Sequence, residues 1–416
     1  MKVKNIWKRA SFLLAGAALA MGNVACSDDN NAPGDGGEII DEQEQTLQLV
    51  TQDYVEKTII PTYRGMADAT MELYDKCLAL RNAGVGNITS DMVQDACDSW
   101  EKARRYWELS EAWLYGPAAD YNIDPHIDTW PLDRTAMENM LNNEQQMNNM
   151  DEDGVFISTL GESLLGFHAV EYMLYGMDEN GIGTGNPRNV NLYTTQELIY
   201  LTAVAADLRN QCVRLEVSWA DGVSDIDQDK WDLLTELELE PTRQYGYEMI
   251  NSGQLGSTWV SYADAMQELL VGAQDIADEV GGLKIGNPTG HGEEDDPDYI
   301  ESPYSLNSIE DFTDNIKSIQ NAYEGYQIGV NGNVADDYIQ PVDHSLSAYI
   351  NSVAPDTDTR MKNAIQAAID AIQQMEEPFA QTARDPAYDA INQAAIAACT
   401  EVSNALTEVM NVIAQN

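Results

Sequence analysis

Positive charge is scarce in this sequence. Only 22 of the 416 residues are Lys or Arg, whereas 70 are Asp or Glu, and the formal net charge is −48. A surface this acidic repels the phosphates of nucleic acids and the headgroups of anionic lipids. The composition therefore argues against nucleic acid as a partner. It also predicts a diffuse attraction for cations, which carries no specificity for any one ion.

Histidine is also scarce, and the common catalytic motifs are missing. The four histidines are His126, His168, His291 and His344. The sequence contains no P-loop, no dinucleotide-binding fingerprint, no G-x-S-x-G elbow and no H-E-x-x-H zinc helix. These absences exclude a His-rich metal site and leave the usual nucleotide-binding and hydrolase sites without support.

No apolar run is long enough to span a bilayer, which takes about 20 residues. The longest run, residues 10–21, follows the basic residues Lys2, Lys4, Lys8 and Arg9. This order is typical of a secretory signal peptide. Cys26 follows the small residue Ala25, as at bacterial lipoprotein processing sites, although Asn23 stands where such sites usually carry Leu. We therefore expect residues 1–25 to be removed and Cys26 to carry a lipid anchor; the alternative is an ordinary secreted protein.

A polar, Gly-rich and acidic segment follows the expected anchor. We predict that residues 26–44 form a flexible tether between the lipid and the folded domain. The run Ser27-Asp28-Asp29 resembles the signal that some bacteria use to send lipoproteins to the outer face of the outer membrane. The expected location is therefore the outer membrane, at the cell surface, and the alternative is its periplasmic face.

Four cysteines remain if Cys26 is acylated: Cys77, Cys97, Cys212 and Cys399. An even number of cysteines in an oxidising compartment permits disulfides. Cys77 and Cys97 flank a Gly-rich turn, so they could lie at the same level of an antiparallel helix pair and form a bridge. The alternative is that all four are small buried hydrophobic residues.

Strand-forming residues are few, and helical periodicity dominates from about residue 42 onward. Between residues 90 and 115, apolar positions recur every three or four residues, which predicts one continuous helix face. Ser90 is the expected N-cap of this helix, and Gly116-Pro117 should end it. Thr194 and Glu197 form the sequence pattern of a capping box at the start of another helix. We therefore predict an all-α fold.

Long loops interrupt the helical pattern at residues 117–134 and 281–307. Loops of this length in compact domains tend to be functional or disordered. We place a domain boundary near residue 250, between an N-terminal helical bundle at residues 45–250 and a C-terminal bundle at residues 251–416.

The segment LLGFHAVEYMLYG at residues 164–176 carries the best candidate for chemistry. His168 and Glu171 are three residues apart, so on a helix both side chains project from the same face. An imidazole beside a carboxylate is a standard pair of ligands for a divalent metal. The order is reversed from the Glu-x-x-His pair of di-iron bundles, and Tyr172 replaces the second His of the H-x-x-E-H zinc pattern. The alternative is a hydrogen-bonded His–Glu pair without a metal.

Four ordered blocks together resemble the imelysin-like family. GFHAVE reproduces the family's G-x-H-x-x-E motif through Gly166, His168 and Glu171. Three further blocks resemble family segments in the same order: WEKARRYWELSEAWLYGP at residues 100–117, DPHIDTWPLD at 124–133 and ESPYSLNSIEDFTDNIKSIQNAYEG at 301–325. The resemblance covers roughly residues 45–416. It implies a fold of two packed helical bundles, with the motif in a cleft between them.

Matching the blocks to the family adds three candidate metal ligands: Glu111, Asp128 and Glu301. Each has an alternative role, because Glu111 could pair with Arg104, Asp128 could cap a turn, and Glu301 could simply extend an acidic run. Carboxylates that converge on one imidazole should have raised pKa values when no cation is bound. Because neutral imidazole is the metal-binding form, we expect affinity to weaken below about pH 6.5.

The function expected from these observations is that of an exported lipoprotein that binds a divalent metal ion, with iron favoured over zinc, or a metal-bearing small ligand. The family also includes proteins described as metallopeptidases, in which a metal-bound water would be activated by Glu171 or another carboxylate. A third alternative is a metal-free module that binds a peptide or glycan. If the protein is an enzyme, the resemblance implies a metallopeptidase.

Overall fold

The computed structural model describes residues 42–178, 182–328 and 338–415. The predicted signal peptide, Cys26 and all but the last three residues of the predicted tether lie outside this part of the chain. The described residues belong to one compact unit. None of the described helices combines the length and the apolar character needed to cross a membrane.

Every regular element in the first part of this unit, from residue 42 to residue 250, is a helix where the chain is described. Its α-helices are α1 (Glu42–Tyr54), α2 (Ile60–Ala83), α3 (Ser90–Glu108), α4 (Pro117–Asp120), α5 (Ile123–Asp128), α6 (Arg134–Leu141), α7 (Glu144–Asn149), α8 (Gly166–Tyr175), α9 (Thr195–Ala220), α10 (Gln228–Glu236) and α11 (Tyr245–Ile250). The long helix α2 packs against both α3 and α9, and α8 packs against α3 and α9.

The remainder is also mainly helical. Its elements are α12 (Tyr262–Glu279), α13 (Gly286–Thr289), α14 (Ser308–Glu324), α15 (Leu346–Val353), α16 (Pro355–Ile372), α17 (Phe379–Thr382) and α18 (Asp389–Gln415), with the strands β1 (Tyr326–Ile328) and β2 (Tyr338–Pro341). The two strands pair antiparallel and form the only sheet in the part of the chain that is described. The prediction of an all-α fold is confirmed, since about 70% of the structure is helical.

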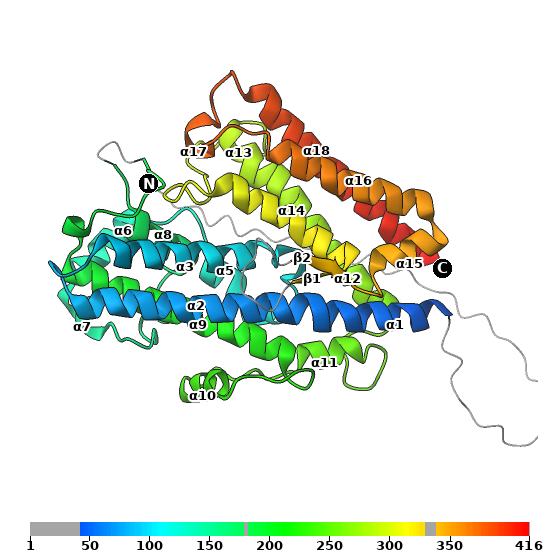
Figure 1. The fold of residues 1–416 in the computed structure, drawn as a ribbon, viewed down its shortest axis with the longest axis horizontal. Helices are drawn as coiled ribbons and strands as arrows, with labels where there is room; N and C mark the ends of the chain where they lie inside the picture. Colours follow the sequence, from blue (N-terminus) through cyan, green and yellow to red (C-terminus); the bar gives the residue numbers. More distant parts are fainter. Residues whose placement is uncertain (1–41, 179–181, 329–337, 416) are drawn as a thin grey trace, which may run out of the picture. The chain divides into compact units, whose positions relative to one another are not determined.

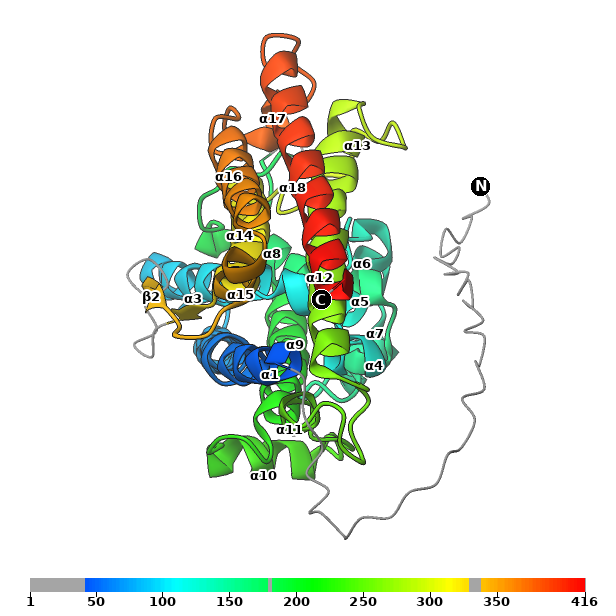
Figure 2. The same cartoon turned by 90° about the vertical axis from the view of Figure 1, so that its right-hand side faces the viewer.

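Two groups of helices meet along α3, α12 and α14. Figures 1 and 2 show α16 and α18 on one side of the α1–α2 pair and α10 and α11 on the other. Helix α14 contacts α3, while α12 contacts α1 and the 3₁₀ turn Glu111–Trp113 that follows α3. The contacts between elements do not define a domain boundary, so the division near residue 250 stays a prediction.

The predicted caps at the starts of two helices can be compared with the structure. Thr194 accepts a hydrogen bond from the backbone N–H of Glu197, and the Glu197 carboxylate accepts one from the N–H of Thr194, which confirms the capping box. Ser90 is the first residue of α3 and does not cap it. Thr89 does, because its hydroxyl accepts a hydrogen bond from the N–H of Met92. The prediction was wrong by one residue because both neighbours can cap a helix.

The predicted Cys77–Cys97 bridge is not formed. All four described cysteines are free and buried, as the alternative expected. The Cys97 thiol points toward the carbonyl oxygen of Leu174 in α8, at 3.9 Å, and burial raises its pKa to about 12. These thiols therefore serve as small core side chains.

Candidate functional site

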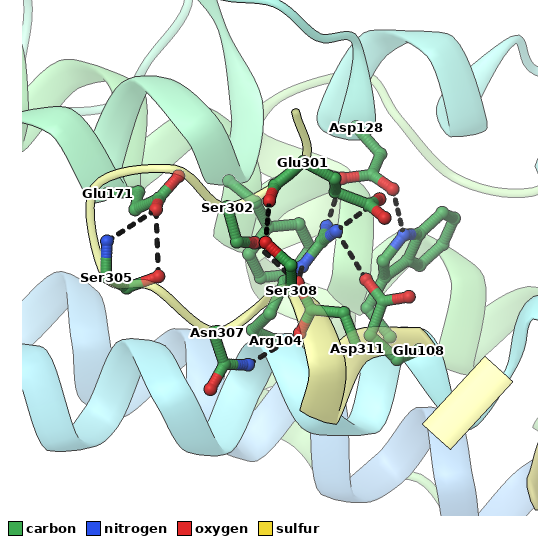
Figure 3. A network of polar contacts seen from close by, with 12 residues as sticks. Arg104, Glu108, Asp128, Glu171, Glu301, Ser302, Ser305, Asn307, Ser308 and Asp311 are labelled. Carbon is green, nitrogen blue, oxygen red and sulfur yellow. Dashed lines mark hydrogen bonds and ion pairs between the residues drawn. The ribbon is translucent and has the colours of Figure 1, made fainter. Parts of the chain in front are cut away.

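An arginine lies at the centre of the polar core. Arg104 is on the buried face of α3, with none of its surface exposed. It forms ion pairs with four carboxylates that come from four separate places in the structure: Glu108 in α3, Asp128 in α5, Glu301 in the loop before α14, and Asp311 in α14. Figure 3 shows these side chains converging on the guanidinium group. The Arg104 network therefore ties both groups of helices together.

A second buried cation joins this network. Lys284 lies in the π-helical segment Val280–Ile285, and its Nζ is 2.9 Å from Glu301 Oε1 and 3.7 Å from Glu108 Oε2. Burial by itself would lower the pKa values of Lys284 and Arg104, but the surrounding carboxylates raise both well above their usual values. Both side chains therefore remain charged at any physiological pH.

The carboxylates outnumber these two cations, and several of those in the network have raised pKa values. Of the predicted metal ligands, Glu111 shows the expected rise. Burial raises the pKa values of Glu108 and Glu111 well above their usual values, despite the nearby basic side chains. It also raises the pKa of Asp311 to about 6. Some of these groups are consequently protonated near neutral pH, which limits the repulsion among them.

Asp128 shows the opposite shift and keeps its negative charge. Burial opposes ionisation, but Arg104 and His168 together hold the pKa of Asp128 well below its usual range. Its Oδ2 also accepts a hydrogen bond from Trp107 Nε1 at 2.7 Å. Asp128 does not act only as a turn residue, because its carboxylate reaches into the buried network.

The glycine of the G-x-H-x-x-E motif brings this carboxylate and His168 together. Gly166 begins α8 with a φ of +72°, a conformation that side chains with a Cβ rarely adopt. A Cβ on Gly166 would lie 1.9 Å from the carbonyl oxygen of Ile127, the residue before Asp128. Only glycine therefore allows the start of α8 to approach the end of α5 this closely.

His168 lies between two carboxylates and is 1% exposed. Its Nδ1 is 3.2 Å from Glu171 Oε2, and its Nε2 is 3.3 Å from Asp128 Oδ1. The second contact lacks hydrogen-bond geometry, so Nε2 has no hydrogen-bond partner among the described residues. Burial alone would lower the pKa of His168, but Asp128 and Glu171 raise it to about 9. The expected threshold near pH 6.5 assumed an imidazole without charged neighbours, so the prediction for metal binding moves to higher pH.

Glu171 holds the loop that carries Glu301. Its Oε1 accepts hydrogen bonds from the backbone N–H of Tyr304 at 2.9 Å and from the N–H and hydroxyl of Ser305, both at 2.8 Å. Figure 3 shows the contact with Ser305 at the turn of this loop. With Oε2 facing His168, both oxygens of Glu171 are engaged, so this residue positions its neighbours.

Three of the five predicted metal ligands converge on one point. One atom each of Asp128, His168 and Glu301 lies within 4.8 Å of the other two, and all three residues are buried. Glu111 belongs instead to a neighbouring group with Glu108 and Asp128 that has the same spacing. Its predicted alternative partner, Arg104, forms its ion pairs with other carboxylates.

Within the first group, two buried atoms make no hydrogen bond. They are Glu301 Oε2 and His168 Nε2, whose contact within the described part of the chain is the ion pair with Asp128 at 3.3 Å. A buried polar atom without a hydrogen bond costs about 1–3 kcal/mol. Both residues therefore keep an atom that could bind a cation.

His168 also borders a pocket. The pocket has a volume of about 450 Å³, and its lining includes residues of the loop between α5 and α6, Met177, Ile182 and Gly183 after α8, and residues of the loop before α14. His168 is nearly inaccessible, so only a small part of its side chain reaches the pocket. The same histidine therefore borders both the pocket and the Arg104 network.

Four residues of the network were not predicted from the sequence. They are the two buried cations, Arg104 and Lys284, and the carboxylates of Glu108 and Asp311. One signal was present for Arg104, which lies four residues after Trp100 and three before Trp107 on the predicted apolar face. A charged residue on such a face is expected to be buried with partners. Lys284 gave no comparable signal, because it stands in a Gly-rich segment without clear periodicity.

The family model described as Imelysin, of peptidase family M75, matches residues 59–406 of this sequence. The chain belongs to the imelysin family. It is 26% identical over 285 residues to iron-regulated protein A of Synechococcus elongatus, covering 68% of this chain and 66% of that relative. The chain thus matches slightly less than two thirds of the relative's length.

Two crystal structures are similar to this imelysin-family chain. The first is described as an iron-regulated protein A precursor from Parabacteroides distasonis; it has a TM-score of 0.71 and 26% identity, and the match covers 92% of this chain and 98% of that one. The second is an imelysin-like protein from Psychrobacter arcticum, with a TM-score of 0.57, 15% identity and coverage of 90% and 95%. The similarity to the second structure shows a shared fold alone.

Proposed function

We propose that this imelysin-family protein binds a divalent metal ion through Asp128, His168 and Glu301. The observation that carries the proposal is the buried group itself, in which one ligand atom each of Asp128, His168 and Glu301 lies within 4.8 Å of the other two. His168 Nε2 and Glu301 Oε2 make no hydrogen bond in the described part of the chain, so they are available to a cation, which would also offset part of the surplus negative charge. Imidazole with carboxylates suits zinc and iron among the common metals.

Iron is favoured over zinc. The relatives from Synechococcus and Parabacteroides both carry the name iron-regulated protein A. The donor set supports the same choice, because it is rich in carboxylates, as in the di-iron sites of helical bundles, whereas structural zinc sites are built from Cys and His. The four described cysteines all lie elsewhere in the core.

A peptidase function is less well supported by this geometry. A bound metal would polarise a carbonyl group and acidify a water molecule, and a nearby base would then have to accept a proton. Glu171, the expected base, has both oxygens engaged by His168 and by the loop at Tyr304 and Ser305. The arrangement supports binding rather than hydrolysis.

The proposal includes export and a lipid anchor at Cys26. The basic and apolar start of the sequence and the small residue before Cys26 support it. The Parabacteroides relative is described as a precursor, which is consistent with a processed N-terminus. The proposed location is the outer membrane, with the domain facing the cell surface.

Elemental analysis of the purified full-length protein tests the metal site. The protein would be stripped with a chelator, reloaded with ferrous iron without oxygen or with zinc, and desalted. We expect an equimolar amount of metal in the wild type. Glu301→Gln should lower affinity by more than the roughly 10–100-fold loss typical of residues that only support a ligand.

Asp298→Asn is the matched control for this experiment. Asp298 is an exposed carboxylate on the pocket rim, outside the group of ligand atoms, so its loss should leave the metal content unchanged. A wild-type protein that retains no metal, or equal retention by Glu301→Gln, would contradict the proposal.

A further inference from the structure

Two aromatic side chains that line the pocket are each packed against a further ring. The Trp130 ring lies 6.1 Å from the His168 ring and 5.2 Å from that of Tyr299. The rings of Tyr304 and Tyr172 meet edge to face at 5.0 Å. Trp130, His168 and Tyr304 line the pocket directly. Its volume of about 450 Å³ lies within the range of small-molecule sites.

One basic side chain of the lining has no carboxylate partner among the described residues. Arg134 is exposed, and within that part of the chain its polar contact runs from Nη1 to Met177 Sδ at 2.8 Å. Nearly all other Lys and Arg residues in the described ranges form an ion pair with a carboxylate. The two further exceptions, Arg209 and Arg214, stack on Tyr74 and Tyr121 instead.

An arginine without a carboxylate partner is informative in this chain because acidic residues outnumber basic ones by 70 to 22. Two carboxylates are close in sequence, since Asp133 precedes Arg134 and Glu138 follows one turn later in α6. Neither forms an ion pair with it, and Asp133 caps the helix. Asp298 on the same rim is uninformative by the same reasoning, because exposed unpaired carboxylates are common on so acidic a surface.

We propose that this pocket binds a small planar organic anion of the aromatic carboxylate class, with its ring between Trp130 and Tyr304 and its anionic group at Arg134. Such a ligand would lie beside the buried imidazole of His168, which is part of the lining. The proposal rests on the proposed function, because His168 belongs both to this lining and to the proposed metal group.

The charge and the shape of the pocket select this class together. Aromatic rings stack favourably on Trp and Tyr, and arginine binds planar carboxylates through paired hydrogen bonds. The net charge of −48 disfavours anions in general, so an anion would need a specific cationic partner. Arg134 is that partner, whereas an apolar or cationic ligand would leave it unused.

Two fluorescent probes that differ only in charge test the proposal. The first is 8-anilinonaphthalene-1-sulfonate, and the second is the neutral N-phenyl-1-naphthylamine, which has the same rings without the sulfonate. Both would be titrated into metal-free full-length protein, and benzoate and salicylate would then be used as competitors. We expect the anion to bind more tightly than its neutral analogue and to be displaced by both acids.

Three variants test whether the anionic probe binds in this pocket. Arg134→Gln should weaken binding of the anionic probe about tenfold, the equivalent of roughly 1.4 kcal/mol, and leave the neutral probe unaffected. Ile182→Glu places a negative charge on an exposed position of the lining and should also weaken only the anion. Arg360→Gln removes a half-buried arginine that lies outside the pocket and should change neither.

Equal affinity of the wild type for the two probes, or an unchanged affinity of Arg134→Gln for the anion, would overturn the proposal. Because these titrations use metal-free protein, their result is independent of the metal analysis. Selective anion binding without any metal retention would refute the metal site alone. Metal retention without anion selectivity would refute the pocket proposal alone.

Discussion

The affinity of the site for metal should depend steeply on pH, because a metal ion must displace the proton of His168. Asp128 and Glu171 on either side of the ring raise the pKa of His168 to about 9, despite its burial. Below that value the imidazole is protonated, and each pH unit adds about 1.36 kcal/mol to the cost of removing the proton. Apparent affinity should therefore fall nearly tenfold for each unit of pH decrease.

The size of the effect separates this geometry from an ordinary histidine. With a pKa of about 9 for His168, affinity should fall about 90-fold between pH 8 and pH 6. A histidine with the usual pKa of about 6.5 would give only about a fourfold decrease over the same interval. Asp128 adds no further dependence, because its pKa is held well below this range.

Calorimetric titration with zinc at pH 6, 7 and 8, in two buffers of different ionisation enthalpy, measures both the affinity and the protons released. The wild type should release close to one proton from His168 per bound ion. His168→Gln should bind more weakly and lose this tenfold dependence, while any protons from Glu108 or Asp311 remain. An affinity that is flat between pH 7 and pH 8, or an equal slope in the variant, would refute the reasoning.

Two further predictions concern the stability of the fold, and a third concerns the lipid anchor expected from the sequence. Gly166→Ala should lower the free energy of unfolding by more than about 2 kcal/mol in a denaturant titration, because Gly166 has a positive φ and contacts the backbone of α5. Gly161→Ala is the control and should be neutral, because Gly161 has open space around it. Arg104→Gln should lower the free energy of unfolding by about 3–5 kcal/mol in the same assay, because buried carboxylates would lose their cation. Arg360→Gln, which removes an ion pair at the surface, is the control and should leave stability unchanged. Cys26→Ala should abolish labelling by a fatty-acid probe in cells, and retained label would contradict lipidation at this residue.

Local periodicity predicted the helices and part of the site. The spacing of His168 and Glu171 correctly placed both side chains on one face, where the Nδ1 of the ring meets the carboxylate. Asp128 and Glu301 could be proposed only from the resemblance to the imelysin-like family. They are 173 residues apart in the sequence, and no local pattern joins positions so distant.

The roles within the site depend on contacts that no local pattern contains. Glu171 was expected to bind metal or activate water, but its hydrogen bonds with Tyr304 and Ser305 make it a support for the Glu301 loop. The same limitation applies to Lys284, whose importance comes from a contact with Glu301 across a Gly-rich turn. Sequence reasoning therefore found the imidazole and its neighbours but could not assign the buried cations.

The buried cations position the carboxylates more than they neutralise them. Arg104 and Lys284 both bind Glu301 through Oε1, which leaves Oε2 free on a side chain that can no longer rotate. Asp128 is fixed in the same way by Arg104 at one oxygen and Trp107 at the other, and its Oδ1 remains 3.3 Å from His168 Nε2. Ligands held this way need little reordering when an ion arrives, so less binding energy is lost. This explains why two buried cations, each costly to bury, lie beside a proposed cation site. Each of them fixes a carboxylate, and the group as a whole still carries a negative charge.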